Sequence, residues 1–68
     1  MELKKVDDNG AWVVLNPEDL LAICNALNEV CNGLDMPEFA ARMGVMREEA
    51  LHLLKTANAI YAKVAQHT

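Results

Sequence analysis

The sequence is poor in several residue types, and each shortage excludes a class of site. It contains no serine, only three glycines, and one residue each of Trp, Tyr and Phe. The chain therefore offers no serine nucleophile and no glycine-rich phosphate loop. Its two cysteines and two histidines lack the spacing of metal ligands. We expect no enzyme, no bound metal and no cofactor.

Positive charge is also scarce. Lys and Arg number 6 against 10 Asp and Glu, which gives a formal net charge of −4. Most of the acidic excess lies in residues 1–35, which contain seven acidic side chains and only two basic ones. Neutralised phosphates supply much of the affinity of nucleic-acid binders, so this balance disfavours nucleic acid without excluding it. It favours a basic protein as the partner, because opposite fields speed encounter.

Nothing in the sequence indicates export or a membrane. No apolar run approaches the length of about 18 residues that would suggest a spanning helix, and the first residues carry acid. Cys24 and Cys31 lie seven apart, roughly 10 Å along a helix, whereas a disulfide needs Cα atoms within about 7 Å. We therefore expect a cytoplasmic protein with two reduced cysteines in its core.

What remains is one small domain, because 68 residues leave no room for a second. Its hydrophobic fraction of 53% is too high for a disordered tail. A domain this short buries only about 60% of the surface that its unfolded chain exposes. We expect its stability to be marginal or shared with a partner.

The N-terminal segment predicts a β-hairpin over residues 3–15. Asn9-Gly10 favours a tight turn, because both residues tolerate a positive φ angle. β-prone residues stand on both sides of it. A lone hairpin is marginal in water, so we expect Trp12 to anchor one face on the rest of the chain. An exposed Trp12 that contacts a partner is the alternative.

A first helix is predicted over residues 17–32, with Asn16 as its N-cap and Pro17 at its first position. Apolar residues recur there at the spacing of a helix that is buried on one side. They are Leu20, Ile23, Cys24, Leu27, Val30 and Cys31. Gly33 is expected to end the helix as a left-handed cap.

Two further helices are predicted, over residues 36–43 and 46–65, separated by Gly44. The expected core stripe of the last helix is Ala50, Leu53, Leu54, Ala57, Ile60, Tyr61 and Val64. Leu51 and Leu21 lie outside the main stripes. Because a helix that is apolar on more than one face contacts more than one neighbour, we expect a homo-oligomer, simplest as a homodimer. The predicted fold class is mainly α, with an N-terminal hairpin before three helices.

Residues 39–53 resemble the helix-turn-helix of bacterial DNA-binding proteins. Ala40 stands where two helices cross closely in that superfamily, and Gly44 stands at the turn residue that needs a positive φ. The residues that match its packing positions are Phe39, Met43, Val45, Ala50 and Leu53. Met46 departs from the pattern, because a Ser or Thr usually caps the recognition helix there. The likeness covers residues 17–60 and implies a tri-helical unit.

The resemblance also implies a DNA surface at the start of the last helix. Arg47 would read guanine there, because Arg bonds guanine in a bidentate manner. The DNA-binding residues that the resemblance implies are Arg42, Arg47, Leu51 and His52. A homodimeric transcriptional regulator follows as the alternative function.

The favoured function rests on a polar ladder of Asn25, Asn28 and Asn32 along the first helix, joined by Glu29. Most such ladders are solvated faces. The alternative is a hydrogen-bonding interface strip, because Asn is a poor helix former and three within two turns have a cost in helix propensity. With Asp19 these residues form the expected partner-binding surface of a small acidic protein-binding module. An immunity protein or antitoxin that binds a basic nuclease is its most concrete form. Further acids of that surface are Asp7, Asp8 and Glu18.

Overall fold

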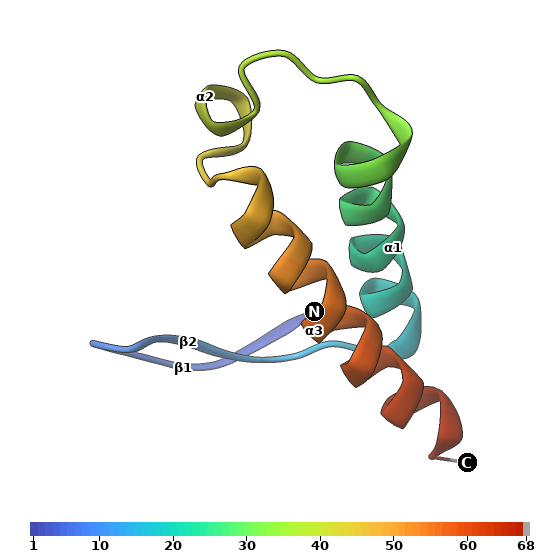
Figure 1. Cartoon of the computed structure of the whole chain (residues 1–68). Helices are drawn as coiled ribbons and strands as arrows, with labels where there is room; N and C mark the ends of the chain where they lie inside the picture. Colours follow the sequence, from blue (N-terminus) through green and yellow to red (C-terminus); the bar gives the residue numbers. More distant parts are fainter. Residues whose placement is uncertain (68) are drawn as a thin grey trace.

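The computed structural model describes residues 1–67 as a hairpin attached to a helical body (Figure 1). The elements in chain order are β1 (Glu2–Asp7), β2 (Gly10–Val14), α1 (Pro17–Asn28), the π-helical turn η1 (Glu29–Gly33), α2 (Phe39–Met43) and α3 (Arg47–Gln66). The fold is mainly α, with an N-terminal hairpin before three helices, as the sequence predicts. No helix within residues 1–67 is both long and apolar enough to cross a membrane.

The core lies between α1 and α3, and the sequence pattern of α1 is confirmed. The Asn16 side chain accepts a hydrogen bond from the Asp19 N–H at 2.8 Å, so it caps the helix as expected. The predicted apolar stripe faces α3 and includes two buried, free cysteines. The buried members of that stripe are Leu20, Cys24, Leu27 and Cys31.

The end of α1 differs from the prediction. Gly33 is not in the left-handed region, so the expected left-handed cap is wrong. Instead the Leu34 N–H donates to the Glu29 carbonyl oxygen at 2.9 Å, which closes a π-type turn over five residues. The chain then leaves the helix in an extended conformation at Leu34.

The buried stripe of α3 keeps the predicted Ala50, Leu54, Ala57 and Tyr61 and differs from the prediction at its edges. Leu53 and Ile60, expected in the core, are 53% and 47% exposed. Leu51, expected outside the stripe, packs against the core instead. Residues on both edges of the stripe have helical spacing, and contact with α1 decides which edge is covered. The α3 residues of the core are Ala50, Leu51, Leu54, Ala57 and Tyr61.

Helix α2 is shorter than predicted and begins three residues later. Glu38 has a left-handed backbone with φ of +55°, so a helix cannot run through it from residue 36. Gly44 ends α2 with φ of +81°, as expected of the turn residue. Ala40 is exposed, so no close helix crossing forms at the position that the helix-turn-helix likeness assigns to one.

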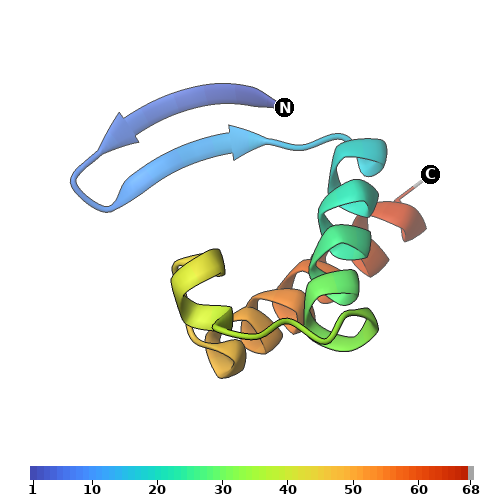
Figure 2. The ribbon, with the colours of Figure 1, turned by 90° about the horizontal axis from the view of Figure 1, so that it is seen from above.

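The hairpin forms, although its turn lies one residue earlier than predicted. Asp8 and Asn9 make the turn between the paired residues Asp7 and Gly10, and only Gly10 has a positive φ, of +136°. A register shift interrupts β1 between Leu3 and Lys5. The hairpin extends away from the helices as a separate arm (Figure 2).

The arm makes the molecule open. The Cα radius of gyration is 13.4 Å, against about 11 Å for a compact chain of this length. Trp12 is 59% exposed, so the prediction that it anchors the hairpin on the body is wrong. Every hairpin residue except the half-buried Asp7 is exposed.

Candidate functional site

The outer side of α1, opposite its buried stripe, carries the polar ladder. Asn25, Asn28, Glu29 and Asn32 are all exposed. The Asn32 side-chain amide donates to the Asn28 side-chain oxygen at 3.0 Å, and this hydrogen bond orients the two side chains of the ladder relative to each other. Residues 17–33 include three acids and no Lys or Arg, so this side of the helix is purely negative.

Asp19 does not lie with the ladder. Because each residue turns a helix by about 100°, Asp19 lies about 120° around α1 from Asn25, on the side next to Met1. Its carboxylate pairs with the N-terminal ammonium of Met1. This hydrogen bond, with the positive charge of the ammonium, lowers the pKa of Asp19 below its ordinary value of 3.8. The fold therefore separates Asp19 from the other four expected partner-binding residues.

The four residues of the DNA-binding alternative are divided between the interior and the surface. Arg42 and His52 are exposed, whereas Leu51 packs against the core. Arg47 is half-buried and engaged within the chain. One guanidinium nitrogen donates to the Cys31 carbonyl oxygen at 2.5 Å, and the guanidinium carbon lies 4.6 Å from the centroid of the Phe39 ring.

Arg47 thus caps the C-terminal end of the first helix, because it donates a hydrogen bond to a carbonyl oxygen there. The last carbonyls of a helix lack partners within it, and they favour a nearby cation. The last turn of α1 contains no basic residue, so Arg47 of α3 supplies the charge to the carbonyl of Cys31 in η1. The sequence reasoning missed this role, because Arg47 and Cys31 lie 16 residues apart and share no local motif.

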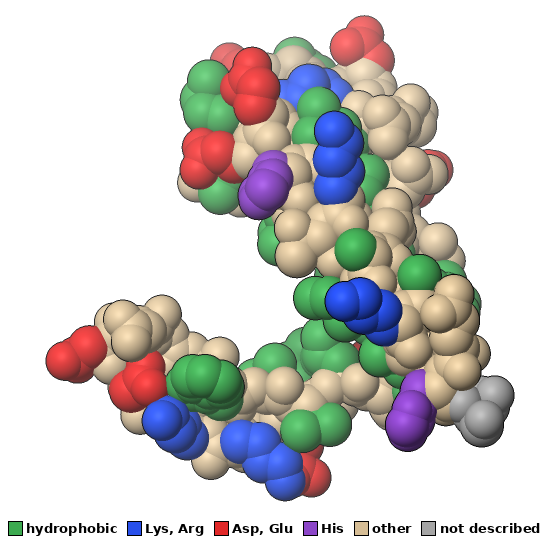
Figure 3. All heavy atoms as spheres, turned by 60° about the horizontal axis from the view of Figure 1, so that its bottom comes forward, with side chains coloured by type: hydrophobic (Ala, Val, Ile, Leu, Met, Phe, Trp, Pro, Cys, Tyr) green, Lys and Arg blue, Asp and Glu red, His purple; other side chains and the backbone are tan. Residues whose placement is uncertain are grey.

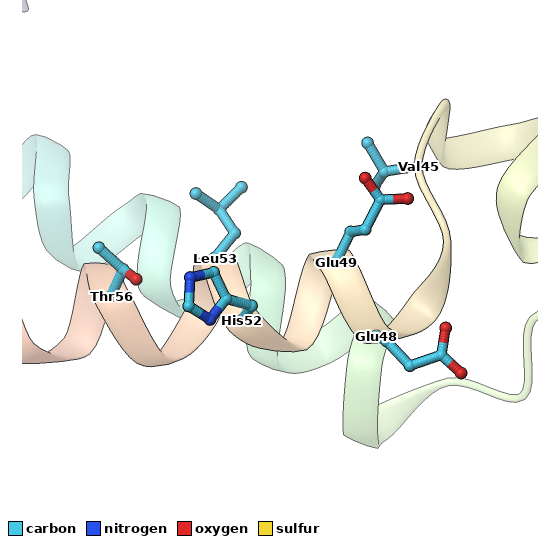
Figure 4. A pocket seen from close by; sticks show the side chains of 6 residues that line it. All are labelled: Val45, Glu48, Glu49, His52, Leu53 and Thr56. Atoms are coloured by element: carbon cyan, nitrogen blue, oxygen red, sulfur yellow. The ribbon is translucent and has the colours of Figure 1, made fainter.

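A shallow groove runs along the exposed side of α3. Val45, Glu49 and Leu53 point to the same side of the helix, while His52 and Thr56 flank them (Figure 4). Glu48 completes the lining. The Glu49 carboxylate accepts a hydrogen bond from the Met46 N–H at 3.1 Å, which caps α3 although Met46 itself cannot. The groove is apolar at its floor and acidic at its N-terminal end.

The hairpin holds a second polar cluster, around Trp12. The indole N–H donates to Asp7 at 3.1 Å, and the Lys5 ammonium lies 5.1 Å from the ring centroid. The Asp7 carboxylate also accepts from the Asn9 N–H at 2.9 Å. The hydrogen bond from Trp12, then that from Asn9, lowers the pKa of Asp7 below its ordinary value of 3.8.

The part of the chain that the structure describes assembles no group of three or more His, Cys, Asp or Glu side chains that could hold a metal. Both thiols are free and buried among apolar side chains. Comparison with protein-family models, with curated proteins and with solved structures finds no match to this chain. The functional argument therefore depends on the surfaces alone.

Proposed function

We propose that this chain is a small, acidic, non-enzymatic protein-binding module whose α1 face binds a basic partner. The proposed face comprises Glu18, Asn25, Asn28, Glu29 and Asn32. The observation that carries the proposal is a ladder of exposed amides flanked by acids, on a helix without a single cation. Asp19 drops out of the face, because the N-terminal ammonium already occupies its carboxylate. Asp7 and Asp8, which the sequence also suggested, drop out because they belong to the hairpin and not to α1.

Two physical properties of this face suit it to a protein partner. Each Asn side chain offers both donors and an acceptor, so the ladder can match a mixed polar surface. The acids stand at its margins, where charge guides encounter and orientation more than it adds to final affinity. A partner with a basic surface would therefore associate rapidly and with a strong dependence on salt.

The helix-turn-helix alternative has less support. Its guanine-reading residue, Arg47, would have to leave the Cys31 carbonyl and the Phe39 ring to reach a base. Glu48 and Glu49, in the first turn of α3, would stand against the phosphates. We therefore do not carry DNA reading forward as a second function.

The test is capture from the source lysate at low salt, with and without nuclease treatment. We expect the native chain to retain a basic protein that survives nuclease, and Glu18→Lys/Glu29→Lys to slow its association by about 10-fold or more. Asp8→Lys/Asp35→Lys makes the same change in net charge away from the face. This matched control should bind the captured protein at nearly the native rate.

Three outcomes would overturn the proposal. One is equal binding by the two double variants, which would make charge alone responsible. Another is retention of the partner by the α1-face variant at the native rate. A third is capture of DNA fragments that nuclease removes, which would restore the helix-turn-helix function.

A further inference from the structure

One face of the hairpin is apolar and uncovered. Strand pairing places Leu3 opposite Val13 and Val6 opposite Ala11, and paired residues project from the same face of a sheet. Leu3, Val6 and Val13 are 60%, 70% and 42% exposed. The Lys5, Asp7 and Trp12 cluster occupies the opposite face. Nothing within residues 1–67 covers the four side chains, which we call the hairpin apolar face.

The same chain exposes a second apolar surface on α3. Leu53 and Ile60 lie seven residues apart, which is two turns, so they form one stripe beside the buried one. Val45, which is half-buried just before α3, extends that stripe along the floor of the α3 groove (Figure 4). We call Val45, Leu53 and Ile60 the α3 apolar strip. An open hollow separates the hairpin from the helices on the face shown in Figure 3.

The exposed area is what a dimer of this chain would need. The solvent-accessible surface is 5389 Å², whereas a compact monomer of 7.5 kDa exposes about 4,200 Å². The excess is about 1,200 Å², and a stable protein–protein interface buries about 800 Å² on each partner. The chain therefore leaves exposed roughly the area that one further protein surface would cover.

We propose that a second copy of this chain covers both surfaces. The hairpin apolar face of each copy packs on the α3 apolar strip of the other, in a two-fold symmetric dimer. Each of the two copies has a hairpin apolar face and an α3 apolar strip, and two-fold symmetry makes the same contact twice. All four surfaces are then covered, and no surface is left to which a third copy could bind. A hairpin of two strands is marginal on its own and gains stability when it packs against a helix.

The charges around the two surfaces are complementary. The groove beside the α3 apolar strip is lined by Glu48 and Glu49, and β1 carries Lys4. The hairpin turn is acidic, whereas the last turn of α3 carries Lys63. An antiparallel arrangement brings each acidic end to a basic one, which favours this pairing and its orientation. The interface is separate from the α1 face, so the two proposals fail independently.

Molar mass in solution tests the dimer directly. We expect the native chain to show twice its 7.5 kDa mass in light scattering and to dissociate on dilution. Val6→Lys and Leu53→Glu each place a charge in both halves of the interface, so each should weaken self-association by at least about 10-fold. Leu34→Glu alters a side chain that is 51% exposed in the loop after η1 and serves as the matched control. It should remain dimeric, with the same helical circular dichroism.

Mixing the two variants tests the exchange of hairpins. In a mixed pair one half of the interface has two native surfaces, and the other half sets the new Lys against the new Glu. We therefore expect equimolar Val6→Lys and Leu53→Glu chains, one labelled with a donor and one with an acceptor dye, to associate more tightly than either alone. A native chain that is monomeric at every concentration would overturn the proposal. So would an intact dimer in either variant, equal disruption by Leu34→Glu, absence of rescue on mixing, or assemblies larger than a dimer.

Discussion

The helical body and the hairpin are stabilised in different ways. Within residues 1–67, the eight buried hydrophobic residues lie between Leu20 and Ala57, and all of them except Leu20 form one cluster of α1, η1, α2 and α3. The hairpin contributes none, and it is held by the pairing of β1 with β2 and by side-chain contacts within the hairpin, such as Trp12 to Asp7. The body thus depends on tertiary burial, whereas the arm depends on its strand pairing and local polar contacts.

This difference indicates that the two regions respond separately to substitution. Local opening costs little where few apolar contacts are lost, so the arm can fray without unfolding the body. The reverse does not follow, because β2 leads into α1 through only two residues, Leu15 and Asn16. The predictions below concern the monomer. Each substitution is made in the Val6→Lys background, so that dimer contacts do not add to the stability of either region.

The largest effect is expected from Leu54→Ala. Leu54 is 6% exposed in the middle of α3, and shortening it leaves a cavity against α1. Such changes cost about 2–5 kcal/mol, a large part of the roughly 3–10 kcal/mol that a chain of this size has. Urea denaturation followed by circular dichroism measures it. Leu53→Ala is the control, and a similar loss there would mean that the exposed stripe is the buried one.

Arg47→Ala should rank second. It removes a charged hydrogen bond to the Cys31 carbonyl and the stacking on Phe39, so we expect a loss of about 2 kcal/mol in the free energy of unfolding. Arg42→Ala, on an exposed position, should change it by less than about 0.5 kcal/mol. Equal effects of the two substitutions in urea denaturation would contradict the structural role of Arg47.

The helices were predictable because their signals are local. Asn16-Pro17 and the α1 stripe gave the start and the buried side of that helix correctly. The buried side of α3 was predictable except at its edges, where only contact with α1 decides that Leu51 is covered and that Leu53 and Ile60 are not. The left-handed backbone at Glu38, which shortens α2, likewise has no sequence signal, since that region favours glycine or asparagine.

The candidate surfaces were predicted less well than the helices. The ladder follows from helical spacing, whereas the pairing of Asp19 with the N-terminal ammonium is a contact across 18 residues. The hairpin apolar face is hidden in the sequence, because Leu3 and Val6 stand three apart and strict alternation would place them on opposite faces. The register shift in β1 brings them to the same face. Such a shift could be suspected only after the strands were paired.

Trp12→Ala should leave the body unchanged while it loosens the arm. Trp12 contacts Lys5 and Asp7 rather than any helix, so we expect the free energy of unfolding of the helices to stay within about 0.5 kcal/mol of the parent. Amide hydrogen exchange in β1 and β2 should accelerate at the same time. A cooperative loss of helical stability would show that the arm packs on the body after all.

The smallest expected effect is a pH response confined to the arm. Because hydrogen bonds from Trp12 and Asn9 lower the pKa of Asp7 below 3.8, the ionised form stabilises the folded hairpin. That contribution is complete above the ordinary pKa and is lost as the pH falls below 3.8 through the lowered value. The indole N–H resonance of Trp12 should therefore hold its position from neutral pH downward and shift only below that point. Asp7→Asn should abolish the shift and Asp8→Asn should keep it, so a shift that survives in Asp7→Asn would assign the titration to another group.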